Sequence, residues 1–175
     1  CDYEHSLYHL LIDEEKPDSC IVEVDTNLHL LPSDETAAQA EKILTGKPIV
    51  AGSAEGAALV SREPISFWGG LCPRTGEIID RRHELSGKIV TGRIFVFPQG
   101  RGSSTSSATL MESIKTGVAP AAIINLKVEP ILALGSIVSD ELYQQAVPIV
   151  VLKEKDFFSI KKNDHLTIKP DGTVK

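Results

Sequence analysis

The sequence predicts a mixed α/β domain built around a small, barrel-like sheet. Many short runs of β-branched and apolar residues are separated by glycine and proline turns, while only two or three segments show helical spacing. The strands are too numerous for a regular alternation of strand and helix. The 175 residues, 42% hydrophobic and 24% charged, have the composition of an ordinary globular protein. A chain of this size buries roughly 70% of the surface that its unfolded form exposes, so a core forms without disulfides.

The chain divides into two parts. We expect residues 1–45 to be an N-terminal extension or linker of unassigned role and residues 46–175 to form the compact domain. The chain begins at Cys1, and its single methionine is Met111. We therefore expect a fragment, a processed product or part of a longer polypeptide.

Two elements are predicted in the first part. Weak alternation predicts a strand over residues 20–24. Ser33 is a plausible N-cap followed by acidic residues, which predicts a helix that runs to Leu44 and ends at Gly46.

The first half of the domain is predicted to hold four strands, each a short β-branched run that stops at a glycine or a proline. A turn at Glu55 and Gly56 precedes the second strand, and a loop with several glycines and prolines, over about 66–76, precedes the third. The predicted strands are 48–51, 57–60, 88–91 and 93–97.

Helical spacing appears after the fourth strand. A helix is predicted over residues 104–115, and Gly117 is placed to end it. Leu110, Met111, Ile114 and Val118 form its apolar face, while Glu112, Ser113 and Lys115 fall on another face.

The rest of the domain is predicted to contain two buried strands, a short helix and a closing hairpin. The strand over 120–126 has no polar face. Gly135 is placed to end the helix, and a Pro-Asp-Gly turn joins the two strands of the hairpin. The elements are 120–126, the helix 129–134, 147–152, and the hairpin strands 166–169 and 173–174.

The bulk properties exclude several classes of function. A net charge of −6 argues against a nucleic-acid or anionic-membrane partner. No apolar run approaches the roughly 20 residues of a membrane span, and no signal peptide is visible. Cys1, Cys20 and Cys72 are far apart and form no C-x-x-C pair, which indicates reduced thiols in the cytoplasm.

The most informative stretch is residues 100–104, Gly-Arg-Gly-Ser-Ser, between a strand and a helix start. Glycines let the backbone approach a ligand closely, and the first amides of a helix attract an anion. Arg101 adds a fork of donors, and the positive potential favours the alkoxide form of Ser103. Capping of the helix by Ser103 or Ser104 is the competing interpretation.

A second cluster surrounds the single tryptophan, Trp68, which precedes the glycine pair that begins at Gly69. Loops with a large aromatic residue and glycines often line sites. The alternative is a tryptophan that plugs the end of the sheet. Asp80 and His83, together with the arginines between them, are acid–base candidates, for which exposed ion pairing is the commoner fate.

No metal site or hydrolase triad can be assigned. His5 and His9 are four residues apart, which suits a shared helix face, but a third ligand is missing. A general-base histidine cannot be placed beside any serine, so a self-contained serine hydrolase is disfavoured.

Taken in order, eight short motifs resemble the small domain of the aconitase X family. The resemblance covers about residues 46–152, and its specificity comes from the number and order of the motifs. They are Pro-Ile-Val-Ala-Gly (48–52), Ala-Glu-Gly (54–56), Ser-Phe-Trp-Gly-Gly (66–70), Thr-Gly (75–76), Ile-Asp (79–80), Gly-Arg-Gly-Ser-Ser (100–104), Ala-Pro-Ala-Ala-Ile (119–123) and Glu-Pro-Ile (129–131).

The resemblance implies an aconitase swivel-domain-like β/β/α barrel that closes over a large catalytic subunit or domain. It implies that this partner binds iron or an iron–sulfur cluster and that the small domain binds no metal. It also implies a hydro-lyase in which Ser103 is the general base. Substrate binding then falls to the anion-binding turn of Gly102 and Ser104, with Arg101, Trp68 and Gly69. The implied substrates are small anions, mevalonate 5-phosphate or cis-3-hydroxy-L-proline.

Three positions depart from the family pattern. Thr105 stands where the wider superfamily often has a carboxylate-binding arginine, a role that would pass to Arg101. Cys72 replaces a more usual aspartate, and Glu84 replaces a proline after His83. Two other functions remain open, namely a non-catalytic anion-binding module and a structural partner subunit with an apolar contact surface around Trp68.

Overall fold

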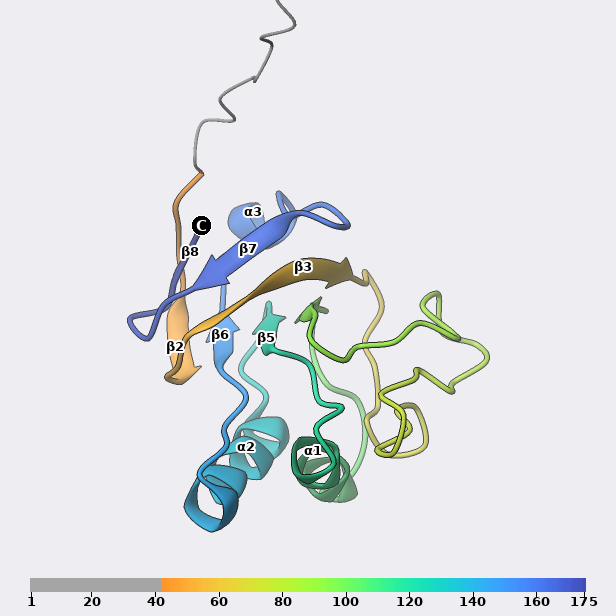
Figure 1. The fold of residues 1–175 in the computed structure, drawn as a ribbon. Helices are drawn as coiled ribbons and strands as arrows, with labels where there is room; N and C mark the ends of the chain where they lie inside the picture. The colour runs from red at the N-terminus through yellow and green to blue at the C-terminus, as the bar shows by residue number, and fades with distance from the viewer. Residues whose placement is uncertain (1–41) are drawn as a thin grey trace, which may run out of the picture. The chain divides into compact units, whose positions relative to one another are not determined.

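The computed structural model describes residues 42–175, and the elements predicted over residues 1–41 lie outside this part. The predicted helix end at Leu44 is wrong, because Leu44 begins a strand. The described part contains, in chain order, β1 (Leu44–Thr45), β2 (Lys47–Val50), β3 (Ala54–Val60), β4 (Ile94–Val96), α1 (Thr105–Lys115), β5 (Ala122–Asn125), α2 (Pro130–Tyr143), β6 (Ile149–Val151), α3 (Glu154–Phe157), β7 (His165–Ile168) and β8 (Thr173–Val174) (Figure 1).

The strands form one nearly closed sheet in the order β1-β8-β7-β3-β4-β5-β6-β2. β3 joins two kinds of pairing, since its first half pairs antiparallel with β7 and its second half pairs parallel with β4. β5 and β6 continue the parallel part, and β2 closes it as an antiparallel strand. The predicted α/β barrel of the swivel-domain type is thereby confirmed.

Closure of the sheet depends on Gly46. The strands at the two ends of the sheet order, β1 and β2, are consecutive in the chain, and Gly46 is the residue between them. Its amide donates to the carbonyl of Gly172, 3.0 Å away, and a Cβ at Gly46 would overlap the side chain of Val150. A glycine is therefore required here because neighbouring strands pack closely against residue 46, and it does not end a helix as predicted.

The sheet buries apolar side chains on both faces. Along β4, Phe95 belongs to the core that packs against the helices, while Ile94 and Val96 belong to the core under β7 and α3. Ile123 and Ile124 of β5 alternate in the same way. The largely apolar sequences of these strands follow from this double burial.

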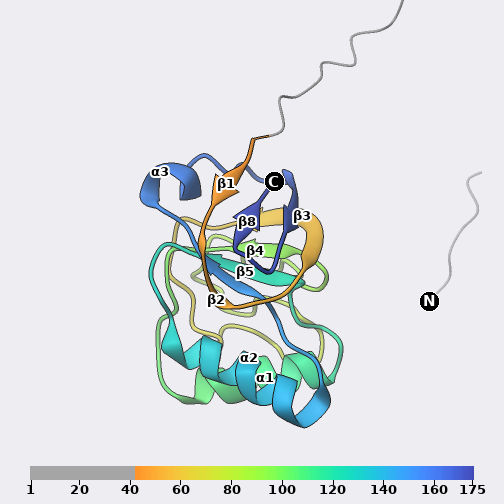
Figure 2. The same ribbon diagram turned by 90° about the vertical axis from the view of Figure 1, so that its left-hand side faces the viewer.

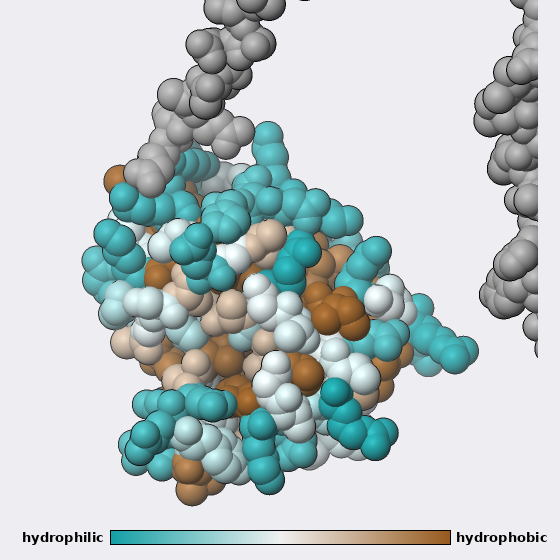
Figure 3. Space-filling view, viewed as in Figure 1, coloured by the Kyte–Doolittle hydropathy of each residue, from teal (hydrophilic) through white to brown (hydrophobic). Residues whose placement is uncertain are grey.

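α1 and α2 lie side by side on one side of the sheet, as both ribbon views show (Figures 1 and 2). α3 lies near the other end of the body, close to β1 and β7. On the face drawn in Figure 3, hydrophilic side chains cover much of the surface over β7 and around the helices, and apolar side chains show between them.

Several predicted elements are corrected by the structure. Residues 88–91 form no strand, because only Ile89 makes a single bridge, to Glu77. Glu55 and Gly56 lie within β3 and form no turn. Ser113 is fully buried. Its hydroxyl donates to the carbonyl of Thr109, so the buried polar group has a hydrogen-bond partner.

Gly135 does not end a helix. It lies inside α2, which begins as predicted with Glu129 as N-cap and Pro130 in its first turn but continues for 14 residues. An alanine Cβ at Gly135 would lie 2.8 Å from the carbonyl oxygen of Ser107, so the glycine permits the close approach of α1. Gly117, by contrast, follows α1 at φ +73° as predicted.

Candidate functional site

The predicted glycine-rich turn is held against the loop that precedes Trp68. Gly100 forms a parallel bridge with Ile65, and the amide of Arg101 donates to the carbonyl of Ile65 at 2.8 Å. Gly102 has φ +123°, and a Cβ there would lie 2.7 Å from the hydroxyl oxygen of Ser66. Only glycine satisfies both conditions, so this residue sets the distance between the two loops.

Trp68 is presented to solvent by a tight turn. The Ser66 hydroxyl donates to the carbonyl of Trp68 at 2.8 Å, and the Trp68 amide donates to the hydroxyl of Ser106 at 3.4 Å. Gly69 follows with φ +71°. The indole is 60% exposed, so the alternative in which Trp68 plugs the end of the sheet is wrong.

The two loops and the segment around Asp80 enclose a cavity of about 630 Å³. Three of the predicted substrate-binding residues, Arg101, Trp68 and Gly69, line it together. Gly102, Ser103 and Ser104 are not among its lining residues. The other lining residues are Glu63, Pro64, Ser66, Gly70, Asp80, Arg82 and His83.

Ser103 and Ser104 lie exposed at the start of α1. Ser104 occupies the N-cap position, but its side chain makes no capping hydrogen bond, and neither hydroxyl has a partner among the described residues. The carbonyls of these two serines accept the amides of Ser106 and Ser107. The capping interpretation therefore fails for Ser104, and the Ser103 hydroxyl is free to meet a ligand.

The turn that carries Ser103 has open backbone donors. The amides of residues 102–105 have no acceptor within the part of the chain that the structure describes. Consecutive free amides at a helix start form a concave site for a carboxylate or a phosphate. The open amides are consistent with an anion-binding turn, and binding of an anion there stays a prediction.

Arg101 faces an acidic partner across the cavity. Its guanidinium lies 3.8 Å from Oδ2 of Asp80, and its side chain is 64% exposed. An ion pair this long and this exposed contributes little to stability. Both side chains of the pair line the cavity, so the guanidinium is available to a ligand there.

His83 is buried, and exposed ion pairing is the wrong expectation for it. Its Nδ1 accepts the amide of Leu85 at 3.1 Å, so the proton of a neutral ring lies on Nε2, 3.3 Å from the Ser61 hydroxyl. That hydroxyl donates to Oε1 of Glu84 at 2.6 Å. The hydrogen bond from Ser61, with further amide bonds, holds the pKa of Glu84 below its ordinary value despite some burial.

Sequence reasoning missed this cluster for a simple reason. Ser61 follows β3 and carries no motif, and it meets His83 only because the loop after Asp80 folds back onto the end of that strand. The polar run from Asp80 to Glu84 was the one available signal.

The described residues show no candidate metal centre. Within residues 42–175, no group of three or more histidine, cysteine, aspartate or glutamate side chains could hold a metal ion. Cys72 is a free thiol, and its pKa is lowered chiefly by a hydrogen bond from the Thr75 side chain. None of the helices described here has the length and apolar character needed to cross a membrane.

Comparison with known proteins places these features in a family. The chain is 44% identical over 118 residues to the phosphomevalonate dehydratase small subunit of Methanosarcina mazei, covering 67% of this chain and 78% of that protein. It is 47% identical over 113 residues to the cis-3-hydroxy-L-proline dehydratase of Pseudomonas aeruginosa, covering 65% of this chain but only 20% of that enzyme.

A solved structure agrees with both relatives. The crystal structure of Thermococcus kodakaraensis aconitase X in its holo-form superposes with a TM-score of 0.69 at 37% identity, covering 77% of this chain and 97% of that chain. The family profile described as the aconitase X swivel domain matches residues 43–175. The chain therefore belongs to the aconitase X family, and residues 43–175 are its swivel domain.

Proposed function

We propose that this chain is the small, swivelling part of an aconitase-X-type hydro-lyase and that Ser103 is its general base. The observation that carries the proposal is the exposed Ser103 hydroxyl, without a partner among the described residues, in a turn whose amides at residues 102–105 are open. Relatives named as dehydratases, one of them a small subunit, support the reaction class and the need for a large catalytic partner.

Dehydration removes a proton from one carbon and a hydroxide from its neighbour. In the proposed mechanism, Ser103 Oγ takes the proton as an alkoxide, which the open amides of the turn stabilise. Arg101 holds a carboxylate or phosphate of the substrate and orients the carbon that loses its proton. The Ser103 alcohol formed in this step returns its proton to solvent before the next turnover.

Departure of the hydroxide needs an electrophile that the described residues do not provide. No cluster of metal ligands exists within residues 42–175, so these residues do not fit an iron or iron–sulfur group. We propose that the large subunit or domain binds that cofactor.

A large partner also accounts for the position of Ser103. The hydroxyl is exposed and lies outside the cavity that Arg101 and Trp68 line. A second protein surface placed over α1 and the cavity would enclose both and exclude water from the base. The swivel domain would thus supply one wall of the active site, in a cytoplasmic enzyme.

The test is reconstitution. The chain is mixed with its large partner and offered mevalonate 5-phosphate and cis-3-hydroxy-L-proline separately, and the appearance of the alkene product is followed. Turnover of one compound by the mixture, with none by the chain alone, is expected and identifies the substrate. Dehydration by the isolated chain, or no turnover of either compound by a stable complex, would contradict the proposal.

A non-catalytic anion-binding subunit is the second candidate. The cavity favours it, because Arg101 and Trp68 line a space that Ser103 does not reach in this chain. Under this alternative, Ser103→Ala leaves the activity of the complex intact, while Arg101→Gln weakens binding of the anion. Retention of activity in both variants would leave only a structural role.

A further inference from the structure

We infer that Asp80 is a positioning residue for Arg101, and that the loop carrying Asp80 is locked to the end of β3 for this purpose. The inference deepens the proposed function, because it concerns how the anion-binding arginine is held. Three connected sets of contacts carry it: the ion pair of Arg101 with Asp80, the turn that Asp80 closes, and the contacts of His83 and Glu84 with the end of β3.

The backbone of Arg101 is fixed, but its side chain is not. Its amide is bonded to Ile65, whereas its long side chain is 64% exposed and has many rotamers. Oδ2 of Asp80, at 3.8 Å, is the only carboxylate oxygen within ion-pairing distance of the guanidinium among the described residues. Asp80 therefore favours the side-chain conformations of Arg101 that place the guanidinium beside it.

Asp80 itself has little freedom. Its Oδ1 accepts the amide of Arg82 at 3.0 Å, and its carbonyl accepts the amide of His83 at 3.1 Å. The two carboxylate oxygens thus have separate tasks, since one closes a local turn and the other faces Arg101. The preceding residue, Ile79, donates its amide to Gly70 at 2.8 Å, which ties the turn to the Trp68 loop.

The turn is anchored on its other side by the buried cluster. His83 contacts Ser61, and Oε1 of Glu84 accepts the Ser61 hydroxyl together with the amides of Arg62 and Glu63. The amide of Glu84 returns a bond to the Glu63 carboxylate at 3.3 Å. Residues 80–84 are therefore docked on the end of β3 although they form no helix or strand.

Preorganisation is the functional consequence. A guanidinium already directed toward the cavity loses less rotamer freedom when an anion binds. The long and exposed pair leaves most of its five donors available to that anion. Removing the Asp80 charge should therefore weaken anion binding through Arg101 without altering the proton transfer.

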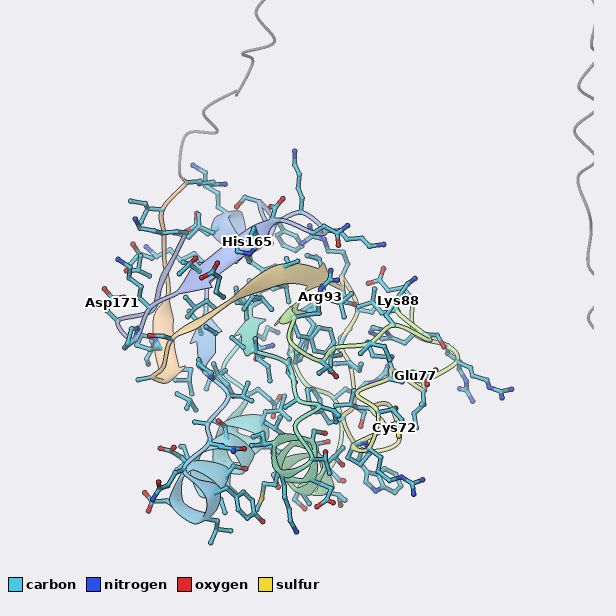
Figure 4. The ribbon with its side chains drawn as sticks, viewed as in Figure 1. Cys72, Glu77, Lys88, Arg93, His165 and Asp171 are labelled. Atoms are coloured by element: carbon cyan, nitrogen blue, oxygen red, sulfur yellow. The ribbon has the colours of Figure 1, made fainter. Side chains whose placement is uncertain are left out.

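Asp80→Asn is the decisive variant. Asparagine keeps a side-chain oxygen for the amide of Arg82 but removes the charge that faces Arg101. Asp171→Asn is the matched control, because Oδ1 of Asp171 closes the same type of turn by accepting the amide of Thr173 at 2.9 Å. Figure 4 shows Asp171 on the side of the body opposite the loop that carries Cys72 and Glu77.

The first measurement needs no catalysis. The heteronuclear Overhauser effect of the Arg101 Nε–Hε group, recorded on the full chain, reports side-chain mobility. We expect a clear fall in this value in Asp80→Asn and no change in Asp171→Asn. An Arg101 signal that is equally ordered in wild type and Asp80→Asn would overturn the inference, whether or not the chain proves to be part of a dehydratase.

The second measurement uses the complex with its large partner. Asp80→Asn is expected to raise KM about two- to fivefold, the range of an exposed ion pair, with little change in kcat. In an Arg101→Gln background the same change should have no further effect, and Asp80→Glu should restore part of the loss. Additive effects of the two changes, or a lower KM in Asp80→Asn, would overturn the inference. Absence of turnover in the wild-type complex would instead contradict the proposed function.

Discussion

Replacement of Gly135 by alanine tests the closest contact between α1 and α2. The new Cβ would lie 2.8 Å from the carbonyl oxygen of Ser107 and 3.0 Å from its Cα, so two helix backbones must move apart. Overpacking of this kind costs about 1–3 kcal/mol, while the better helix propensity of alanine returns about 1 kcal/mol. We therefore expect a net loss of about 1 kcal/mol and a fall in Tm of about 4 °C.

Urea unfolding followed by circular dichroism measures this change as a lower midpoint with an unchanged slope. Asp140→Ala is the control, because Asp140 is exposed on the same helix and its replacement raises helix propensity without a new contact. Its stability should stay the same or rise slightly. A Gly135→Ala protein more stable than wild type by about 1 kcal/mol would refute the packing argument and leave propensity as the only effect at this position.

Three further predictions concern other contacts. Because the pKa of Glu84 is lowered in the folded protein, its stabilising effect is present above about pH 4.5 and is lost as the pH falls through the folded-state pKa. Glu84→Gln should therefore lower the urea midpoint at pH 7 and have a smaller effect as the pH falls toward the folded-state pKa, and equal midpoints at pH 7 would contradict this. In a protein whose other cysteines are replaced by serine, Cys72 should react with iodoacetamide at pH 7 faster than a model thiol, and Thr75→Val should slow it, because Thr75 is the main cause of the lowered thiol pKa. An unchanged rate would dismiss that cause. Gly46→Ala should destabilise the domain by about 2 kcal/mol or more in the same unfolding assay, because the Cβ has no room at the closure of the sheet, and a neutral effect would mean that the strands yield there.

The buried strands and the closing hairpin follow from local patterns. β4 and β6 are apolar at every position, and β5 is apolar except for Asn125 at its end, because both faces of the sheet are covered; such runs identify strands without any tertiary information. β7 and β8 flank a Pro-Asp-Gly turn whose chemistry is equally local. These are the parts of the fold that the sequence predicts.

The errors occur where distant contacts override local preference. The β-branched residues of 88–91 satisfy strand propensity, but only Ile89 finds a partner to bridge. Gly46 and Gly135 are both consistent locally with helix ends, whereas each serves a close approach to a remote segment. α3 has only four residues, and no periodicity can be detected over that length.

The candidate site, too, can be predicted from the sequence only in part. Arg101, Trp68 and Gly69, which the motifs single out, line one cavity, and their role in substrate binding stays a prediction. Asp80 and His83 acquire their partners through the fold, because Ser61 and Arg101 are each about twenty residues away in sequence. Ser103 is not among the residues that line this cavity, and no local pattern of the sequence predicts that separation.

The central claim is that Ser103 moves the substrate proton, and its most direct test is the single-turnover rate of dehydration by the assembled complex. Ser107→Ala is the control, because its hydroxyl lies on the same helix but is bonded to the carbonyl of Ser104. We predict that Ser103→Ala slows the rate by about a hundredfold or more, with assembly and substrate affinity preserved, while Ser107→Ala stays within a few-fold of wild type. A Ser103→Ala complex that dehydrates its substrate at the wild-type rate would contradict the account.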